Sequence, residues 1–583
     1  MIRKKKFFLG INLEMDPSAA IVSQGKVIAY CEEERFNRIK HAKGYYPQES
    51  IKYCLNKAGC DLGDIEEITI NWNLRAYNSG EIEEFYKSIQ NKYKVDNYTL
   101  AWQKRNLFKR SKKEYENYHK SHLRSIFGNT KIPNIMGYPH HFTHAFQSFS
   151  QSGFQEAICI TIDGSGDQHT TVLWKCQSHK IAPVYEIRIP HSLGWFYAAI
   201  TEYLGFKAYD GEYKVMGLAA YGGKNYKIRQ ALKKIIKVSK DGIGYVIDPS
   251  FIHYGKHSYS GRFTDKLVHL LGKKPLRENN EIDKWSMSLA FESQRLLEIT
   301  VIRLIKWATE KYKIYNVCVG GGVGLNVKLN SKIFDIKEVK DVFAHPLCSD
   351  SGAACGSALL ANYKKNDYFP EKLTNLNLGY CESDREIEKN LKITKVNYKR
   401  EKNIALSVAK LLDKDYVVGW FQGSMEAGPR ALGYRSILAN PRSISSRDRV
   451  NKIVKFREDW RPFCPSVLEE HVDKYFSSYT HAPFMIMAFQ ANNKLSKDAP
   501  AIVHVDGTAR VQMVSKKYNP LYHKMISAFY KITGVAVVLN TSFNIKGEPI
   551  VCTSRDALRT FWSSGLDALA IGNYLILKPK VIK

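Results

Sequence analysis

The 583-residue sequence lacks several patterns that would place it in a specialised class of proteins. Its 11 cysteines include no Cys-x-x-Cys pair, so neither a zinc ribbon nor a disulfide framework is indicated. An odd number of scattered cysteines in a large chain is typical of reduced, mostly buried thiols. No apolar run approaches the roughly 18 residues that a membrane-spanning helix requires. These absences favour a globular protein of a reducing compartment, without a membrane partner.

The first residues also lack the features of a secretory signal. Basic residues precede an apolar run, but this run breaks at Asn12 and Glu14, and no small-residue cleavage site follows. A content of 44% hydrophobic and 25% charged residues is that of a folded protein, and the length favours two to four domains. We therefore expect a cytoplasmic protein with more than one hydrophobic core.

Acidic residues are scarce relative to basic ones, since 57 aspartates and glutamates stand against 87 lysines and arginines, a net charge of +30. Such an excess can indicate a surface for nucleic acid or membrane, or sites for anionic small molecules. The lysines are spread along the whole chain among many Ile, Asn and Tyr residues, as in a lysine-biased proteome. This distribution favours a general bias of composition over a nucleic-acid surface. Local phosphate sites have to be identified from particular residues.

A strand–turn–strand pattern occurs twice in the N-terminal half. Residues 7–13 and 19–22 are apolar around a polar turn at 14–18, and a turn at 23–26 leads to a third apolar segment at 27–31. Residues 157–162 and 170–174 flank the turn 163–167 in the same way, and another turn precedes the segment 181–187. Two such units are typical of a duplicated, actin-like nucleotide-binding fold, in which each loop faces phosphates.

The other segments predict an α/β chain of two domains. Apolar residues at helical spacing predict an inserted helical pair at about 80–128, and a further amphipathic helix at 292–313. A buried strand with a glycine cluster follows at 316–324. The polar segment 366–402 indicates the domain boundary, so we expect domains at 1–372 and 373–583, the second an α/β unit with its own strand and glycine signals.

Two histidines at helical spacing are candidate metal ligands. His140 and His144 lie in a predicted helix that runs to about residue 152, and side chains four residues apart share one helix face. The residue after His140 is another histidine instead of the Glu of zinc proteases, which disfavours hydrolytic zinc. With Asp163 and Asp350 as carboxylate ligands, the set favours iron(II), manganese or magnesium. The alternative is a helix cap with a polar surface.

Glycine-rich turns follow two buried strands. The segment Asp163-Gly164-Ser165-Gly166 either offers backbone N–H groups to a phosphate or forms a tight hairpin turn. The segment Gly320-Gly-Gly-Val-Gly-Leu-Asn326 allows an adenine or a ribose to approach the backbone closely. Because it follows a buried strand and precedes the segment 349–352, this second cluster is the stronger indication of a nucleotide.

Arginine-flanked turns are concentrated in the last third of the chain. They occur at 428–436, 455–462 and 504–510, and Asn540 to Asn544 end a buried strand at 535–539. Fixed cations beside short hydroxyl and amide side chains suit a small phosphorylated or carboxylated substrate. A single arginine is more often a solvated surface charge, but the set beside Gly and Pro turns favours an anion pocket.

Over nearly the whole chain, these segments resemble the carbamoyltransferase family of nodulation-factor, cephamycin and tobramycin biosynthesis. The motifs that carry the resemblance are Glu32–His41 (EEERFNRIKH), His140-His-x-x-His144-Ala, Asp163-Gly, Gly211–Ala219 (GEYKVMGLA), Gly320-Gly-Gly-Val with Asn326, Met425–Gly433 (MEAGPRALG), Arg461-Pro-Phe, and Leu539–Pro549 (LNTSFNIKGEP). Their number and order are specific to the family.

The resemblance implies a duplicated actin-like domain, similar to the tRNA threonylcarbamoyl transferase subunit, followed by a YrdC-like α/β domain. It implies that carbamoyl phosphate is broken down in the YrdC-like domain and that its carbamoyl group reaches ATP, giving carbamoyl adenylate and pyrophosphate. The actin-like domain then transfers the carbamoyl group to a hydroxyl, or an amine, of a small-molecule acceptor in specialised-metabolite biosynthesis. Carbamoyl phosphate and this acceptor are the expected binding partners. We do not expect the protein to bind nucleic acid, and a homodimer is compatible with the resemblance.

The resemblance also assigns residues by position. It implies ATP as cofactor and an iron-type divalent metal, with manganese or magnesium as alternatives, held by His140, His144, Asp163 and Asp350. The implied adenosine pocket contains Gly321, Gly322 and Asn326, with Glu212 on the ribose side. The implied carbamoyl-phosphate pocket contains Arg430, Lys455, Arg510, Asn540 and Ser542, and Lys40 lines the transfer site.

The chain departs from the family in the first hairpin loop. Family members read His-Asp there, whereas this sequence reads Met15-Asp16, and a thioether cannot accept a proton. The catalytic candidates are therefore Lys40 with Glu14, Asp16 or His41 as a replacement base, unless the acceptor is an amine that needs less help. Two alternatives stay open. The charge and the shared fold favour a tRNA-modifying enzyme, and Met15 favours a repurposed nucleotide-binding protein that transfers nothing.

Overall fold

The computed structural model describes residues 6–579 apart from 94, 96, 107–112, 256–257, 279, 459 and 462, and the chain divides into two compact units. The first unit consists of the residues up to Asn12, Ala19–Ile28 and Leu55–Lys372. The second consists of Leu13–Ser18, Ala29–Cys54 and the chain from Leu373 onward. The chain therefore enters the second unit twice before residue 55.

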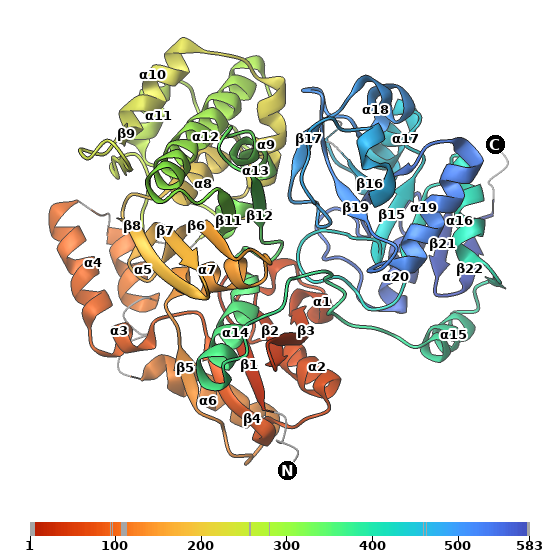
Figure 1. Ribbon diagram of the computed structural model, residues 1–583, viewed down its shortest axis with the longest axis horizontal. Helices are drawn as coiled ribbons and strands as arrows, with labels where there is room; N and C mark the ends of the chain where they lie inside the picture. Colours follow the sequence, from red (N-terminus) through yellow and green to blue (C-terminus); the bar gives the residue numbers. More distant parts are fainter. Residues whose placement is uncertain are drawn as a thin grey trace. The chain divides into compact units, whose positions relative to one another are not determined.

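Two five-stranded sheets with one topology form the N-terminal part of the fold (Figure 1). The first has the order β3-β2-β1-β4-β5, with β1 (Phe7–Asn12), β2 (Ser18–Ser23), β3 (Lys26–Glu32), β4 (Ile65–Ile70) and β5 (Ile135–Gly137). The second has the order β8-β7-β6-β11-β12, with β6 (Glu156–Gly166), β7 (His169–Gln177), β8 (Lys180–Arg188), β11 (Asn316–Gly320) and β12 (Asp341–Ala344).

In both sheets, the first strand along the chain is central, two hairpin-linked strands lie on one side, and two parallel strands lie on the other. β4 is parallel to β1 and β5 is parallel to β4, just as β11 is parallel to β6 and β12 is parallel to β11. Such crossovers need long connections, which helices supply. This repetition confirms the duplicated actin-like α/β class that the two strand–turn–strand units predict.

Two helices pack together between these sheets. Helix α7 (His140–Ser150) contacts β6 and β11, and α14 (Ala353–Asn366) contacts β1, β4 and α7. Small residues allow the close approach: a Cβ at Gly10 would lie 1.8 Å from the Ala354 carbonyl oxygen, and one at Gly356 would lie 2.8 Å from the Thr143 side chain. The helix pair places the start of α7 beside the turn that precedes α14.

The outer face of the second sheet is covered by helices, so β6 is buried on both faces and reads as a continuous apolar run. The main cover is α12 (Lys284–Tyr312), which contacts β6 and β7. It begins eight residues before the predicted start because the Asp283 side chain accepts the Ser286 N–H and caps it. Around it lie α8 (Leu193–Tyr203), α9 (Glu212–Leu218), α10 (Tyr226–Ile235), α11 (Asp265–Leu271) and α13 (Val327–Phe334), and a small sheet of β9 (Ile236–Val238) and β10 (Tyr245–Ile247).

The insertion contains more helices than the sequence predicts. After α3 (Leu74–Asn78), its described part holds α4 (Glu81–Lys92), α5 (Asn97–Asn106) and α6 (Glu114–Phe127) instead of a pair, and residues 107–112 lie outside the described residues. The chain leaves α4 at Tyr93, whose backbone is extended at φ −126°. The helical spacing of apolar residues correctly predicted helices in this insertion, but it did not reveal that the first helix ends at Lys92.

The second unit is built on an eight-stranded mixed sheet of order β13-β22-β21-β14-β15-β20-β16-β19. Its strands are β13 (Lys399–Arg400), β14 (Val418–Phe421), β15 (Arg435–Ala439), β16 (Cys464–Leu468), β19 (Gln512–Val514), β20 (Val537–Ser542), β21 (Ala568–Ile571) and β22 (Tyr574–Leu577). The pairs β14–β21 and β16–β19 are parallel, and the other neighbouring strands of this sheet pair in antiparallel fashion. A mixed α/β sheet fits the YrdC-like class expected for this part.

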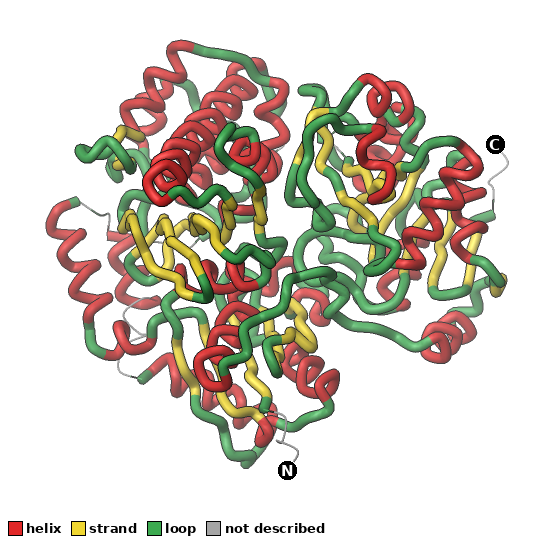
Figure 2. Tube along the Cα trace, viewed as in Figure 1, coloured by secondary structure: helices red, strands yellow, loops and turns green. Residues whose placement is uncertain are grey.

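Helices cover this sheet and complete the unit. α16 (Ile404–Asp413) packs on α19 (Pro520–Thr533), and α20 (Ser554–Trp562) contacts β14 and β21. Residues 367–383 are loop in Figure 2, and then α15 (Asp384–Ile393) begins with a capping box between Ser383 and Glu386. The remaining elements are α1 (Glu34–Asn37), α2 (Gln48–Ala58), α17 (Ile444–Arg449), α18 (Asn493–Asp498), β17 (Ala488–Gln490) and β18 (Thr508–Arg510). Among the described residues, no helix is long and apolar enough to cross a membrane.

Candidate functional site

The four predicted metal ligands come together in the first unit. His140 and His144 lie on the first turns of α7, Asp163 lies near the end of β6, and Asp350 lies in the turn before α14. One ligand atom from each residue lies within 4.8 Å of the others. Both imidazoles are buried, whereas 16% of each carboxylate side chain stays exposed. The cluster is thus open only on its carboxylate side.

The spacing within this cluster matches that of ligands around one ion. The two histidine Nε2 atoms lie 3.1 Å apart. Asp163 Oδ2 lies 3.7 Å from His140 Nε2 and 3.5 Å from His144 Nε2, and Asp350 Oδ1 lies 3.4 and 3.8 Å from the same two atoms. Ligands that share an ion at about 2.0–2.2 Å are separated by roughly 3.0–3.6 Å. Two nitrogen and two oxygen donors with an open side therefore fit a divalent transition metal.

Neighbouring groups orient His140 toward the cluster. Its Nδ1 donates to the Asn71 carbonyl oxygen at 3.1 Å, which leaves Nε2 as the nitrogen with a lone pair. The backbone N–H of His140 donates to Asp167 Oδ2 at 2.9 Å, so this carboxylate caps the start of α7. A Cβ on Gly166 would lie 2.2 Å from the His140 ring, so only glycine fits there. Gly166, predicted as a phosphate contact, packs against a predicted metal ligand.

The charges of the cluster support one another. Burial disfavours a protonated imidazole, but the carboxylates of Asp163 and Asp350 raise the pKa of His140 well above its usual range. Burial likewise opposes ionisation of Asp350, yet the two histidines lower its pKa to about 2. The carboxylates are therefore charged at neutral pH. Without a cation, they attract protons to the imidazoles, so a metal ion and protons compete for this cluster.

A bulge in β6 brings Asp163 to the cluster. The pairing of β6 with β7 shifts register between Ile162 and Gly166, so residues 163–165 lie outside the regular ladder. The turn of this hairpin falls at Asp167 and Gln168, later than the predicted turn at 163–167. The prediction placed the turn too early because glycines and aspartates in a bulge carry the same signature as those in a turn.

The glycines next to Asp163 hold its carboxylate in place. Gly164 N–H donates to Oδ1 at 2.9 Å, and Gly322 N–H donates to Oδ2 at 3.1 Å. Gly321 adopts φ +82°, and a Cβ there would lie 2.3 Å from the Ile162 carbonyl oxygen. Only glycine tolerates both conditions. The two glycine turns predicted from the sequence thus meet at Asp163.

The residues predicted to bind adenosine lie in the first unit and have polar partners of their own. The side-chain amides of Asn326 and Gln294 bind each other at 2.9 and 3.1 Å, and Asn326 also caps α13 through the Leu329 N–H. The carboxylate of Glu212 accepts the Tyr209 N–H at 2.8 Å, and burial raises its pKa to about 7. The mutual hydrogen bonds fix the orientation of the two side-chain amides. The carboxyl group of Glu212, by contrast, changes its charge near neutral pH.

The predicted carbamoyl-phosphate residues all belong to the second unit, and Lys455 contacts one of them, Ser542. This buried lysine donates to the side-chain and backbone oxygens of Ser542 and Asn544 over distances of 2.6–3.1 Å. Burial and the nearby charges of Arg457, Arg461 and Lys40 hold its pKa well below the usual range. Cations that repel one another in this way favour an anion among them.

Asn540 lies on β20, two residues before Ser542, and Arg510 lies on β18. Asn540 is fully buried, and its Nδ2 donates to Ala431 O, Ser466 Oγ and Gln512 Oε1 at 3.0–3.1 Å, while its Oδ1 has no hydrogen-bond partner. Arg510 Nε contacts Cys464 Sγ at 2.8 Å, and Cys464 pairs with Asn540 across the sheet. An unused amide oxygen can accept a hydrogen bond from a carbamoyl N–H group.

The turn that carries Arg430 is shaped by a buried carboxylate. Glu426 Oε1 accepts N–H groups from Leu432, Tyr434 and Arg435 at 2.6–3.4 Å. Arg435 belongs to the same arginine-rich motif but is buried, stacks on Phe421 at 3.6 Å, and binds backbone carbonyl groups. Arg435 therefore stabilises the turn from inside, whereas the side chain of Arg430 is only half-buried.

The catalytic candidates from the N-terminal loops belong to the second unit. Glu14, Met15 and Asp16 are partly buried, and Lys40 is exposed at the start of a short helical turn that ends at Ala42. His41 Nδ1 lies 2.7 Å from Asp16 Oδ1. Among the residues that bind or orient the predicted site residues, the sequence did not single out Asn71 or Cys464, because each lies far from its partner along the chain.

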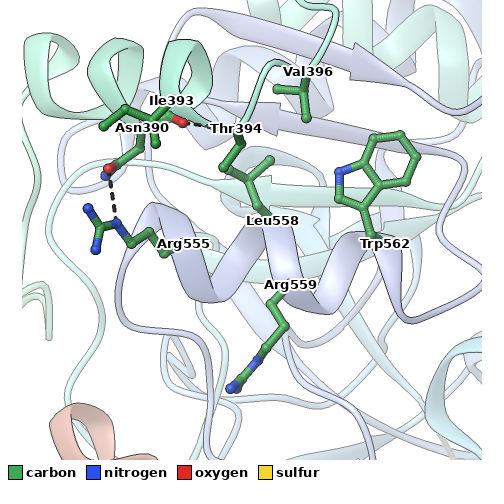
Figure 3. Close-up of a pocket in the computed structure, with 8 residues that line it drawn as sticks. All are labelled: Asn390, Ile393, Thr394, Val396, Arg555, Leu558, Arg559 and Trp562. Atoms are coloured by element: carbon green, nitrogen blue, oxygen red, sulfur yellow. Dashed lines mark hydrogen bonds between the residues drawn. The ribbon is translucent and has the colours of Figure 1, made fainter.

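A pocket of about 390 Å³ lies elsewhere in the second unit, between α15 and α20 (Figure 3). It is lined mainly by apolar side chains, and Arg555 Nε donates to Asn390 Oδ1 at 3.1 Å on its rim. The lining residues are Asn390, Ile393, Thr394, Val396, Arg555, Leu558, Arg559 and Trp562. They include none of the predicted site residues.

Comparisons with known proteins match this arrangement over both units. A family model described as the carbamoyltransferase N-terminus matches residues 8–359, and one described as the carbamoyltransferase C-terminus matches residues 409–578. The nodulation protein NolNO of Sinorhizobium fredii is 35% identical over 97% of this chain and 79% of its own length.

Two further proteins show where the similarity weakens. The 3'-hydroxymethylcephem-O-carbamoyltransferase of Streptomyces clavuligerus is 30% identical over 59% of this chain and 61% of its own length. The crystal structure of HypF from T. kodakarensis aligns with 62% of this chain and 48% of its own at 13% identity, with a TM-score of 0.32, too low to support an argument. The two family models and the full-length similarity show that this chain belongs to the carbamoyltransferase family and is a transferase.

Proposed function

We propose that this enzyme breaks down carbamoyl phosphate to carbamate and phosphate, and that the carbamate attacks the α-phosphate of ATP to give carbamoyl adenylate and pyrophosphate. The adenylate then transfers its carbamoyl group to the hydroxyl of a small-molecule acceptor and releases AMP. The observation that carries the proposal is the cluster of His140, His144, Asp163 and Asp350, which lies beside two glycine turns in a member of the carbamoyltransferase family. Such a cluster suits a metal ion that contacts nucleotide phosphates. A hydroxyl acceptor of specialised metabolism is supported by the name of the cephem relative, an O-carbamoyltransferase.

In the first unit, the proposed ligand is ATP with a divalent metal, for which we favour iron(II). Asp163 and Asp350 face the open side of the cluster and neutralise part of the ion's charge. When bound, the ion stabilises negative charge on phosphate oxygens. The amide of Asn326 and the carboxylate of Glu212 are proposed to bind the adenosine, the latter by accepting a ribose hydroxyl.

In the second unit, the proposed ligand is carbamoyl phosphate. Lys455, Arg430 and Arg510 supply positive charge for the phosphate, and the unpartnered Asn540 Oδ1 accepts a hydrogen bond from the carbamoyl nitrogen. A carbamoyl group is a poor electrophile until it is attached to a good leaving group, and AMP is one. The adenylate therefore supplies the activation that the later transfer needs.

Release of pyrophosphate tests the first half of the proposal. The purified protein loaded with iron(II) should release pyrophosphate from ATP only when carbamoyl phosphate is present, and AMP should accumulate in an equal amount. Omission of carbamoyl phosphate controls for contaminating ATP hydrolysis, which yields ADP and phosphate instead. Absence of pyrophosphate with iron(II), manganese and magnesium alike would refute the proposed reaction.

A further inference from the structure

Two short segments of the second unit hold an unusual concentration of strained backbone. Met15 has φ 38°, and on the other segment Arg38, His41 and Ala42 have φ 61°, 65° and 40°. A residue with a side chain is strained in this left-handed region and persists there only when its surroundings enforce it. Such clusters are typical of sites where a side chain must point in one direction.

Two arginine clamps enforce this conformation. Arg35 pairs with Glu32 at 3.3 Å and donates to the Gly428 carbonyl at 2.9 Å, while Gly428 N–H donates back to Glu32 at 2.9 Å. Arg38 donates to the carbonyl groups of Ile550 and Pro549 at 2.7 and 2.8 Å. The segment that carries His41 is thereby fixed to two loops of the second unit.

The result of this arrangement is an Asp–His pair. Asp16 Oδ1 lies 2.7 Å from His41 Nδ1, and Glu34 Oε2 accepts the His41 backbone N–H at 2.7 Å. A carboxylate can only accept, so Nδ1 carries the proton and Nε2 is the basic nitrogen. A carboxylate that fixes an imidazole in this tautomer also stabilises the imidazolium that forms when Nε2 takes a proton.

We propose that His41, positioned by Asp16, is the general base for the acceptor and that the acceptor is a hydroxyl compound. This inference rests on the proposed carbamoyl transfer. Nε2 removes the proton of the acceptor hydroxyl while its oxygen attacks the carbamoyl carbon of the adenylate. The bond from that carbon to the AMP phosphate oxygen breaks, AMP leaves as the anion, and the product is the O-carbamoyl ester. His41 thus takes the role that Met15 cannot fill.

The competing groups in these segments are less suited to this role. Asp16 is engaged by His41, and its N–H donates to the Glu14 carbonyl, which folds the loop into a tight turn. Glu34 binds His41 and Arg35, and although burial alone would raise its pKa, Arg35 and Lys40 lower it, so it is a weak base. A base must have a pKa near the working pH to be effective.

The test compares His41→Gln and Asp16→Asn with His481→Gln, an exposed histidine paired with Glu469 in the same unit. Pyrophosphate release dependent on carbamoyl phosphate reports the first half-reaction. AMP release reports transfer with water as the hydroxyl nucleophile, and hydroxyurea formation reports transfer to hydroxylamine, a neutral nucleophile that needs no base. The variants are followed in a single turnover.

We expect His41→Gln to slow AMP release to water by about 10²–10⁴-fold and Asp16→Asn by a smaller factor, while both variants still form pyrophosphate and hydroxyurea. His481→Gln should behave like the parent protein. A water rate within threefold of the parent, or an equal loss with water and hydroxylamine, would overturn the inference. Failure of the parent protein to release pyrophosphate would instead refute the proposed function.

Two further measurements test the role of His41 independently of the rate at which AMP is released to water. In protein labelled with ¹⁵N-histidine, the signal lost in His41→Gln should show a protonated Nδ1, and Asp16→Asn should weaken that preference; a protonated Nε2 would contradict it. Because Asp16, Glu34 and His41 also lie close enough together to hold a cation, the metal content of His41→Gln is measured too. Loss of one metal equivalent would assign the cluster to a cation and overturn the role as base.

Discussion

The two units present sites of opposite electrostatic character. In the first, two carboxylates face two buried imidazoles, and each carboxylate is stabilised by positive charge. In the second, a buried lysine lies among other cations and its positive charge is destabilised. The first site therefore favours a cation and the second an anion. The net charge of +30 would by itself suggest a nucleic acid, but the charges that matter are the few that are buried.

The largest expected effect comes from removing the first site's nitrogen ligands. The double variant His140→Ala/His144→Ala should lose bound metal and slow AMP release by at least about 10³-fold, because two carboxylates alone hold a transition metal weakly. Metal content by mass spectrometry and AMP release measure it. His169→Gln, a partly exposed histidine in the same unit, is the control. Full metal content in the double variant would mean that the cluster is not the metal site.

A substitution in the second site should change the KM for carbamoyl phosphate and leave the KM for ATP unchanged. Lys455→Met keeps the unbranched stem of the side chain but removes the ammonium, so we expect KM for carbamoyl phosphate to rise about 10²-fold while KM for ATP stays within twofold. Lys414→Met, an exposed lysine of the same unit, should change neither. A change in KM for ATP alone would place Lys455 in a nucleotide site and break the distinction between the two units.

A substitution that disturbs the backbone of the first site at Gly321 should weaken ATP binding, with a smaller effect than the two changes above. Gly321→Ala adds a Cβ 2.3 Å from the Ile162 carbonyl oxygen at a residue with φ +82°, so the turn must shift. We expect ATP to bind about tenfold more weakly, as titration calorimetry would measure, because left-handed backbone alone costs roughly 1–2 kcal/mol for a residue with a side chain. Gly223→Ala, where an added Cβ meets nothing within 4 Å, should bind ATP normally. Unchanged binding in Gly321→Ala would remove this turn from the nucleotide pocket.

The smallest expected effect is a pH dependence of ATP binding. Burial raises the pKa of Glu212 to about 7, so the carboxylate is neutral below that pH and charged above it. Only the charged form accepts two hydrogen bonds from a ribose, so affinity should rise several-fold as pH increases from 6 to 8. Glu212→Gln should flatten this rise. A rise of equal size in the variant would exclude Glu212 as its cause.

The raised pKa of Glu212 also makes the free energy of unfolding depend on pH. A carboxyl group whose pKa is higher in the folded state stabilises the fold most at pH values below its unfolded pKa of about 4.5. That contribution is lost as pH rises from about 4.5 toward 7. Glu212→Gln should remove this part of the pH dependence of unfolding.

The sequence predicted the parts of the fold that depend on local pattern. The strands around Asp163 and the helix of His140 and His144 were identified because alternating or helical hydrophobicity is a property of a short window. The same window misplaced the β6 turn, since a bulge and a turn use the same residues. It also gave no sign that Asp16 and His41 meet, because that contact depends on two arginines held by loops more than 390 residues away.

For the candidate sites, residue types were predicted better than their partners. The spacing of the histidines suggested two ligands on one helix face, and the structure adds that the Asn71 carbonyl selects the nitrogen that faces the cluster. Likewise, glycines 321 and 322 were predicted to leave space for a ligand, whereas in the structure they also hold the Asp163 carboxylate. Such double roles arise from tertiary packing and leave no periodic signal.

The interleaved path of the chain has a consequence for synthesis on the ribosome. Residues 13–18 and 29–54 emerge early, but the rest of their unit is not made until after residue 373. Arg35 and Glu32 bind Gly428, so these hydrogen bonds cannot form until more than 300 further residues are translated, on the order of tens of seconds at 5–20 residues per second. Folding of the second unit therefore cannot be completed domain by domain along the chain, and a nascent chain halted near residue 372 would display these charged segments to chaperones.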